Sequence, residues 1–168
     1  GKAMSLNFRK RTLTLLAVAA AALLMAVPAP AQETVKIGFF APITGPAAAD
    51  GASAQHAVEL AVKEVNAAGG IKGKKVELIV YDDRLNPQEA VAIANKLIER
   101  DQVIGVVSGS YSGPTRVTAP IFAKAGFPMV AGYAVHPDVT KAGESNFRNG
   151  FLGEVEGKFN VVHGSPQL

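Results

Sequence analysis

The residues with the clearest chemical potential lie in one segment, from Ser108 to Thr115, which reads Ser-Gly-Ser-Tyr-Ser-Gly-Pro-Thr. It combines small hydroxyl side chains with glycines, and its proline is typical of the first turn of a helix. Free N–H groups at the start of a helix attract an anion, and hydroxyl groups add further donors. The segment therefore suits a ligand carboxylate, while serine here also fits an ordinary helix cap.

Three kinds of enzyme site are excluded by the glycine-rich segments. A P-loop needs Gly-Lys-Ser/Thr at its end, whereas Gly113 is followed by Pro114. A nucleophile elbow needs a nucleophile between its two glycines, and Tyr111 occupies that position. A dinucleotide fingerprint does not match the segment 45–51. We therefore expect a protein that is not an enzyme.

Metal and cofactor chemistry has little support in the sequence. There is no cysteine, and the histidines at positions 56, 136 and 163 show no metal-ligand spacing. His56 fits a solvated helix face, and His136 lies where it either touches a ligand or has a structural role. Asp82 and Asp83 are best explained as residues that end a strand and hold the next loop. No metal and no cofactor are expected.

The charge distribution argues against a nucleic-acid partner. The formal net charge is +3, but four of the 17 basic residues lie within positions 1–11. The remaining 13 accompany 14 acidic residues, which gives a net charge of −1 for residues 32–168. A body this close to neutral carries no basic surface for nucleic acid.

The amino-terminal segment has the features of a secretory signal peptide. Arg9, Lys10 and Arg11 precede a charge-free run at positions 13–27, and a small-residue pattern ends at Ala31. The run of 15 residues is short for a membrane span, which needs about 20. We expect export to the periplasm and cleavage after Ala31, with residues 1–3 lying before the natural start at Met4.

The body alternates strand and helix patterns, which predicts a doubly wound α/β fold with a parallel sheet. Asn86 fits the cap of the second helix, with Pro87 at its first position. In such sheets ligands bind beyond the carboxyl ends of the strands. The expected strands are 35–40, 76–81, 103–107 and 127–131, the expected helices are 52–67, 87–98 and 114–125, and the loops at the binding edge are 44–50, 82–86, 108–115 and 133–137.

Several short motifs, in this order, resemble the periplasmic substrate-binding proteins of ABC transporters, of the leucine/isoleucine/valine-binding type. The resemblance extends over residues 35–157, so we expect 1–31 to be the signal peptide, 32–157 to be the amino-terminal lobe, and 158–168 to be a tail outside the family. The motifs are Val-Lys-Ile-Gly at 35–38, Thr-Gly-Pro at 44–46, Glu-Val-Asn-Ala-Ala-Gly-Gly-Ile-Lys-Gly at 64–73, Tyr-Asp-Asp at 81–83, Asn-Pro at 86–87, Ala-Val-Ala-Ile-Ala-Asn-Lys-Leu-Ile at 90–98, and Phe-Arg at 147–148.

The resemblance implies the first lobe of a two-lobed clamp that closes around a small ligand and delivers it to an ABC permease in the membrane. Position by position, it implies a ligand-binding hydroxyl at Ser112 and a main-chain contact at Tyr133. Thr115, in the adjoining helical turn, is a further candidate donor. A ligand-sensing domain of a receptor or regulator with the same fold is the alternative.

Three positions depart from the pattern of the amino-acid binders in this family. Val135 stands where a threonine would be, so a hydroxyl acceptor for an ammonium group is missing. Asp50 replaces an aromatic residue, and Tyr111 adds a ring beside Ser112. An amino acid and an aromatic or other organic acid therefore both remain open as ligands, and an amide or urea-like ligand is a further alternative. Since relatives are much longer, we expect this chain alone to expose apolar surface, bind weakly and aggregate.

Overall fold

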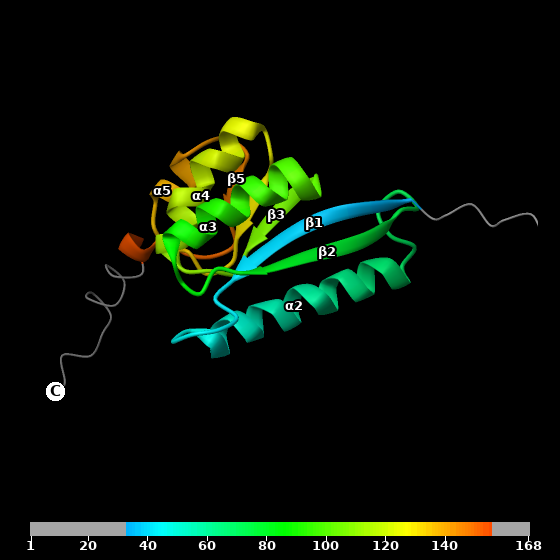
Figure 1. Ribbon diagram of the computed structural model, residues 1–168, viewed down its shortest axis with the longest axis horizontal. Coiled ribbons are helices and arrows are strands. Elements are labelled where there is room, and N and C mark those ends of the chain that lie inside the picture. The colour runs from blue at the N-terminus through cyan, green and yellow to red at the C-terminus, as the bar shows by residue number, and fades with distance from the viewer. Residues whose placement is uncertain (1–32, 156–168) are drawn as a thin grey trace, which may run out of the picture. The chain divides into compact units, whose positions relative to one another are not determined.

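The computed structural model describes residues 33–155. Five strands form one parallel sheet in the order β2-β1-β3-β4-β5, which confirms the predicted doubly wound α/β class (Figure 1). The expectations for residues 1–31 and 158–168 lie outside the described residues. The elements are β1 (Thr34–Ala41), α2 (Ala48–Ala67), β2 (Lys75–Asp82), α3 (Pro87–Lys96), η1 (Leu97–Asp101), β3 (Gly105–Ser108), α4 (Ser112–Ala125), β4 (Met129–Ala131), α5 (Asp138–Lys141) and β5 (Asn146–Arg148).

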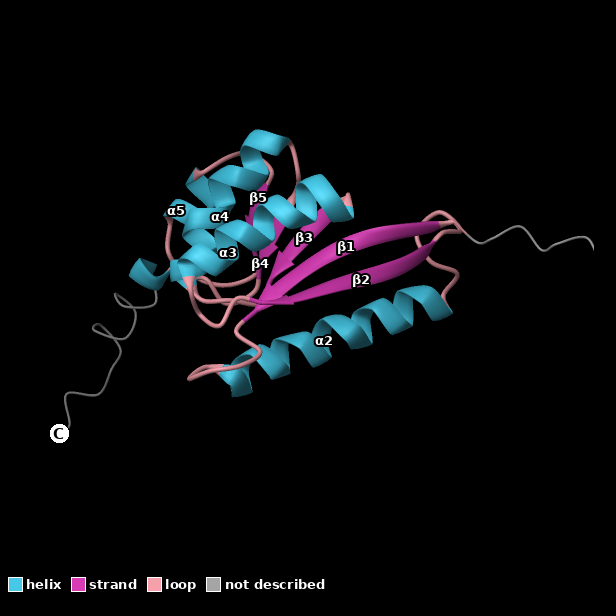
Figure 2. Ribbon diagram, in the orientation of Figure 1, coloured by secondary structure: helices cyan, strands magenta, loops and turns pink. Residues whose placement is uncertain are grey.

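Helices lie on both faces of the sheet, with α3 and α4 on one face and α2 on the other (Figure 2). The hydrophobic core lies under α3 and α4, where Leu97, Phe122 and Met129 are fully buried against Phe40 of β1. Burying side chains of this size is the main favourable term in folding such a domain. The core therefore fixes β3, β4 and α4, the elements that carry the candidate ligand site.

The opposite face of the sheet is covered only in part. Helix α2 packs on β1 and β2, while on β4 and β5 the side chains of Val130 and Phe147 are 38% and 53% exposed. Val65 of α2 is also 38% exposed. Helices thus cover one half of this side of the sheet, and apolar side chains on the other half are partly exposed among the described residues.

Helix α3 begins where the sequence predicts. The side chain of Asn86 accepts hydrogen bonds from the N–H groups of Gln88 (2.8 Å) and Glu89 (3.4 Å), and Pro87 occupies the first position. Ala90, Ile93 and Ala94 of α3 belong to the core, as does Leu97 of η1, and Ile98 is partly buried against it.

Other boundaries differ from the predictions. Helix α2 begins at Ala48 rather than at residue 52, so Asp50 lies in its first turn and not in a loop. Helix α4 begins at Ser112 rather than at Pro114. The strands β3 and β4 each begin two residues later than predicted, and β5 and α5 were not predicted.

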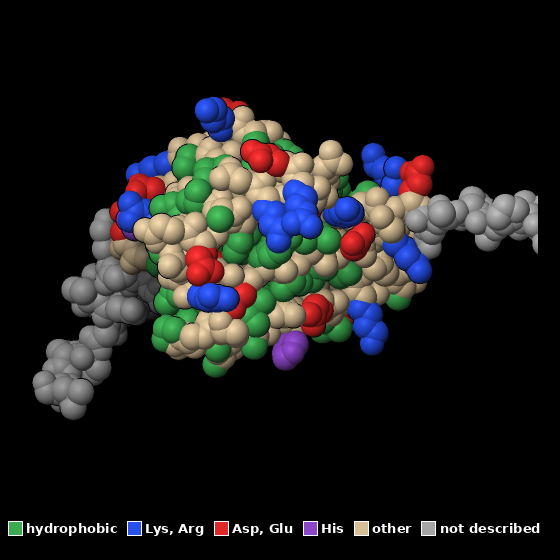
Figure 3. Space-filling model, viewed as in Figure 1, with side chains coloured by type: hydrophobic (Ala, Val, Ile, Leu, Met, Phe, Trp, Pro, Cys, Tyr) green, Lys and Arg blue, Asp and Glu red, His purple; other side chains and the backbone are tan. Residues whose placement is uncertain are grey.

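The surface of the described region carries charges of both signs that are interspersed with apolar side chains on the visible face (Figure 3). Within residues 33–155 no helix combines the length and hydropathy needed to cross a bilayer. The same residues contain no group of three or more His, Asp and Glu side chains placed to hold a metal ion.

Candidate ligand-binding site

The segments that were predicted to form the site meet at the carboxyl edge of the sheet. Strand β3 runs directly into the segment that opens α4, and the neighbouring β4 runs into loop 133–137. Parallel strands end at the same edge, so Ser112 of α4 lies beside Val135 and His136. The expected position of the third helix's amino end at this edge is therefore observed.

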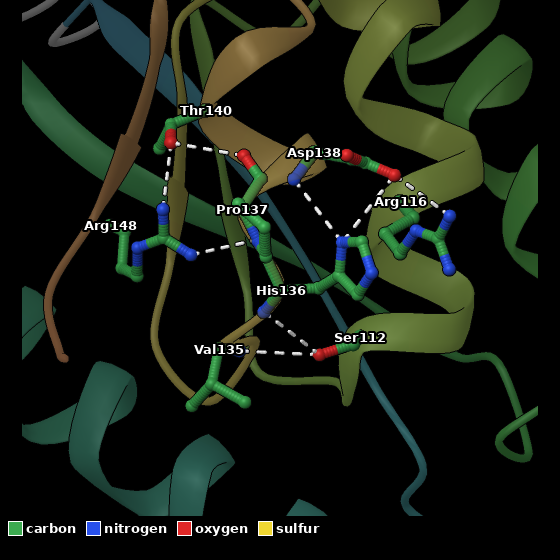
Figure 4. Close-up of polar contacts among 8 residues, drawn as sticks. All are labelled: Ser112, Arg116, Val135, His136, Pro137, Asp138, Thr140 and Arg148. Carbon is green, nitrogen blue, oxygen red and sulfur yellow. Dashed lines mark hydrogen bonds and ion pairs between the residues drawn. The ribbon is translucent and has the colours of Figure 1, made fainter. Parts of the chain in front are cut away.

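The hydroxyl group of Ser112 links these two segments. Its Oγ accepts hydrogen bonds from the main-chain N–H groups of Val135 (3.2 Å) and His136 (3.3 Å), as Figure 4 shows. A hydroxyl oxygen has two lone pairs and one hydrogen. Because both lone pairs are engaged, the hydroxyl of Ser112 can only donate to a further partner, and that partner must be an acceptor.

The amino end of α4 supplies additional donors. The residue before the helix, Tyr111, makes no side-chain cap, and the first helical hydrogen bond runs from Thr115 N–H to Tyr111 C=O (3.2 Å). The N–H groups of Ser112 and Gly113 make no hydrogen bond with another described residue. Such N–H groups, together with the helix dipole, favour a negatively charged group at this point.

Loop 133–137 is held in place from β5. The guanidinium of Arg148 donates to the C=O of His136 (2.8 Å) and to the Thr140 hydroxyl (2.7 Å) (Figure 4). The sequence resemblance included Phe147-Arg148 without giving the arginine a role. The structure shows that Arg148 fixes the loop that carries Val135. The main-chain groups of Tyr133 make no hydrogen bond with another described residue and remain available to a ligand.

His136 has a structural role in this loop. Its Nδ1 accepts from the N–H of Asp138 (3.2 Å), and the Asp138 carboxylate is paired with Arg116 of α4 (2.8 Å). These contacts join α4 to α5 (Figure 4). Of the two alternatives for His136, the structural one therefore accounts for its ring in the described structure.

Thr115 requires a correction. Its side chain is fully buried, and its Oγ1 forms hydrogen bonds with the Ser108 hydroxyl (2.7 Å) and the Ser110 C=O (3.3 Å). A buried hydroxyl with these partners does not reach a ligand. Thr115 instead fixes the shape of the segment that presents Ser112.

Asp50 also lies elsewhere than predicted, in the first turn of α2, and it is exposed. It accepts a hydrogen bond from the hydroxyl of Tyr111. Val135 is 40% exposed at the same edge. Next to Tyr133 a hollow of about 340 Å³ opens between α2 and the sheet, with Phe39, Val58 and Val107 in its wall.

The two aspartates at the end of β2, Asp82 as its last residue and Asp83 directly after it, hold the neighbouring loops, as predicted. Asp82 accepts from Ile43 N–H (2.9 Å), the Thr44 hydroxyl (2.5 Å) and Arg84 N–H (2.9 Å). Burial opposes ionisation, but these donors, the Thr44 hydroxyl foremost, hold the pKa of Asp82 below its usual value. The Asp82 carboxylate thus joins the loop after β1 to the loop after β2.

Asp83 is fully buried behind the site, and its Oδ1 accepts from Leu85 N–H (2.8 Å). Burial raises the pKa of this carboxyl above its usual value, although the hydrogen bond from Leu85 N–H partly offsets the effect. A raised pKa in the folded state favours folding with the proton bound. The corresponding stability is complete below the ordinary aspartate pKa of about 3.9 and is lost as the pH rises through the raised value.

Asp83→Asn keeps an oxygen for Leu85 N–H and cannot ionise. The variant should therefore gain stability relative to the wild type as the pH rises from about 4 towards 8. Urea unfolding of both proteins across this range measures the difference, and Asp82 is present in both, so its opposite pH dependence cancels. A stability difference that does not change with pH would contradict the assignment.

A parallel sheet with hydrogen-bond donors gathered at its carboxyl edge is typical of α/β proteins that bind a ligand at that edge. Residues 34–153 match the periplasmic binding protein family. The chain therefore belongs to the periplasmic binding protein family, in its leucine/isoleucine/valine-binding type.

Individual relatives agree with this assignment. A leucine-, isoleucine-, valine-, threonine- and alanine-binding protein of Pseudomonas aeruginosa is 35% identical over 134 residues, which cover 77% of this chain and 36% of that protein. A Leu/Ile/Val-binding protein of Rhizobium johnstonii is 40% identical over 116 residues, 69% of this chain and 31% of that protein. The chain thus spans about a third of the length of these relatives.

Solved structures show the same fold. The branched-chain amino acid substrate-binding protein LivJ of Streptococcus pneumoniae, in complex with isoleucine, has a TM-score of 0.70 and 32% identity, covering 77% of this chain and 38% of that one. A solute-binding protein of Rhodopseudomonas palustris, in complex with 3,4-dihydroxybenzoic acid, has a TM-score of 0.67 and 25% identity. The match covers 78% of this chain and 37% of that one.

Proposed function

We propose that the protein is the solute-binding component of an ABC importer, which captures a small carboxylate-bearing ligand in the periplasm and passes it to the membrane permease. The observation that carries the proposal is the geometry of Ser112, whose lone pairs are both engaged and whose hydrogen is free to donate. Together with the free N–H groups of α4, it makes a site with several hydrogen-bond donors for a carboxylate.

The names of the neighbours support the same class of ligand. Isoleucine and 3,4-dihydroxybenzoic acid, which two of them hold, share a carboxylate and otherwise differ in shape and charge. Export is part of the proposal, with removal of residues 1–31 after Ala31 and with residues 32–157 as the amino-terminal lobe of the clamp. Binding a ligand, rather than converting it, agrees with the substrate-binding character of the family.

Calorimetric titration tests this function on a two-lobed protein of the relatives' length that contains residues 32–157, called the full-length protein below. The panel contains leucine, isoleucine, benzoate and 3,4-dihydroxybenzoate, with glucose as a neutral control. We expect at least one carboxylate to bind with a Kd in the micromolar range or below and glucose not to bind. Binding of the neutral sugar with no response to any carboxylate would contradict the proposal.

A further inference from the structure

Two tyrosine rings lie together at the edge of the sheet, directly before and beside Ser112. The rings of Tyr111 and Tyr133 are stacked, with centroids 6.1 Å apart and planes inclined by 21°. They come from different segments, one preceding α4 and the other following β4. Each tyrosine is about two-fifths exposed, at 40% and 41%.

A second stacked pair shows what is unusual about this one. The rings of Phe40 and Phe122 have nearly the same geometry, with centroids 6.3 Å apart and planes inclined by 23°. Both side chains, however, are fully buried in the core. That pair is accounted for by core packing. The tyrosine pair leaves aromatic surface exposed beside the hydroxyl and N–H groups of Ser112. Another aromatic ring can therefore stack on it.

Asp50 fixes one member of the pair. Its carboxylate, in the first turn of α2, accepts the hydrogen of the Tyr111 hydroxyl. This hydrogen bond raises the pKa of Tyr111, so the hydroxyl stays protonated and remains a donor. Three segments separated in sequence therefore hold one ring in place, and ordering a ring in advance lowers the cost of binding to it.

We propose that Tyr111 and Tyr133 form a stacking surface for the planar group of an aromatic carboxylate bound at Ser112, with Asp50 as the positioning residue for Tyr111. This inference rests on the proposed function and narrows its ligand class. Offset stacking favours an aromatic ring over a saturated ring of similar size. An α-ammonium group is less well served here, because both lone pairs of Ser112 are engaged and Val135 has no hydroxyl.

The test compares benzoate, cyclohexanecarboxylate and leucine by calorimetry on the full-length protein. Benzoate and cyclohexanecarboxylate carry the same charge on rings of similar size, so their affinity ratio reports aromatic recognition. We expect benzoate to bind about tenfold more tightly than cyclohexanecarboxylate and more tightly than leucine. Tyr133→Leu should bring the affinity ratio close to one, because benzoate loses the stacking contact and cyclohexanecarboxylate has none to lose.

The role of Asp50 has its own readout. Tyr111→Phe and Asp50→Ala should each lower the benzoate-to-cyclohexanecarboxylate ratio, and the double variant should lower it no further, because both changes remove the same hydrogen bond. Tyr81→Phe is the matched control, since the Tyr81 hydroxyl donates to Asp101 (2.8 Å) away from the site. The benzoate-to-cyclohexanecarboxylate affinity ratio of Tyr81→Phe should equal that of the wild type. Thermal unfolding confirms that each variant is folded.

The results separate this inference from the function on which it rests. A ratio near one in the wild type, or a ratio that Tyr133→Leu leaves unchanged, overturns the stacking surface. If Ser112→Ala still weakens carboxylate binding in that case, the proposed function stands without it. Failure of every carboxylate to bind overturns both.

Discussion

Replacing Ser112 with alanine should weaken carboxylate binding by the full-length protein about 10- to 100-fold. A hydrogen bond to a charged group contributes about 1.5–3 kcal/mol, and the variant loses the only side-chain donor that we assign to the carboxylate. The same change leaves the N–H groups of Val135 and His136 without their shared acceptor, which loosens loop 133–137. Calorimetric Kd values for wild type and variant measure the effect.

Ser145→Ala is the matched control for this prediction. Ser145 is a half-buried serine just before β5, at the opposite edge of the sheet, and its C=O accepts from Met129 N–H (3.0 Å) through the main chain. The Kd of Ser145→Ala for the carboxylate should stay within twofold of the wild-type value. A Kd for Ser112→Ala within twofold of the wild type would show that the serine does not hold the ligand.

Gly51→Ala should destabilise the fold by about 2–3 kcal/mol, the cost of overpacking a closely packed contact. A Cβ atom at Gly51 would lie 2.2 Å from the C=O oxygen of Pro42, so α2 or the loop after β1 must shift. Helix propensity alone gives the opposite sign, because alanine in a helix is favoured over glycine by up to about 1 kcal/mol. The sign of the measured change therefore distinguishes the close contact from propensity.

Gly113→Ala tests the same substitution where there is space. This glycine also lies in the first turn of a helix, and a Cβ atom there would meet only a Pro87 ring carbon at 4.0 Å. Its free energy of unfolding should be unchanged or higher by up to about 1 kcal/mol. Urea unfolding of both variants provides the comparison, and a stabilising Gly51→Ala would mean that α2 lies farther from Pro42.

The contrast between α3 and α2 explains which boundaries the sequence could predict. Helix α3 has a local signal, since Asn86 caps it with its own side chain. Helix α2 follows Ala47, which makes no side-chain hydrogen bond, so nothing in the sequence marks its start. The short strand β5 depends on pairing with β4, and such tertiary contacts are invisible to periodicity.

In the candidate site too, the sequence predicts the local features and does not predict the tertiary contacts. The segment 108–115 was identified from its hydroxyls and glycines, and it does present Ser112 at the carboxyl edge. The engaged lone pairs of Ser112 depend on partners 23 and 24 residues away, and the bond between Tyr111 and Asp50 spans 61 residues. Thr115 has the same kind of side chain as a ligand donor, and only its complete burial distinguishes the two roles.

The most direct test of a carboxylate site at the start of α4 compares a bound acid with its carboxamide. The two differ little in shape, but only the acid brings a negative charge to the N–H groups and the Ser112 hydroxyl. Calorimetry on the full-length protein should show the carboxamide binding at least about 30-fold more weakly, with Ser112→Ala removing part of that difference. Equal affinities for the acid and its carboxamide would contradict the site.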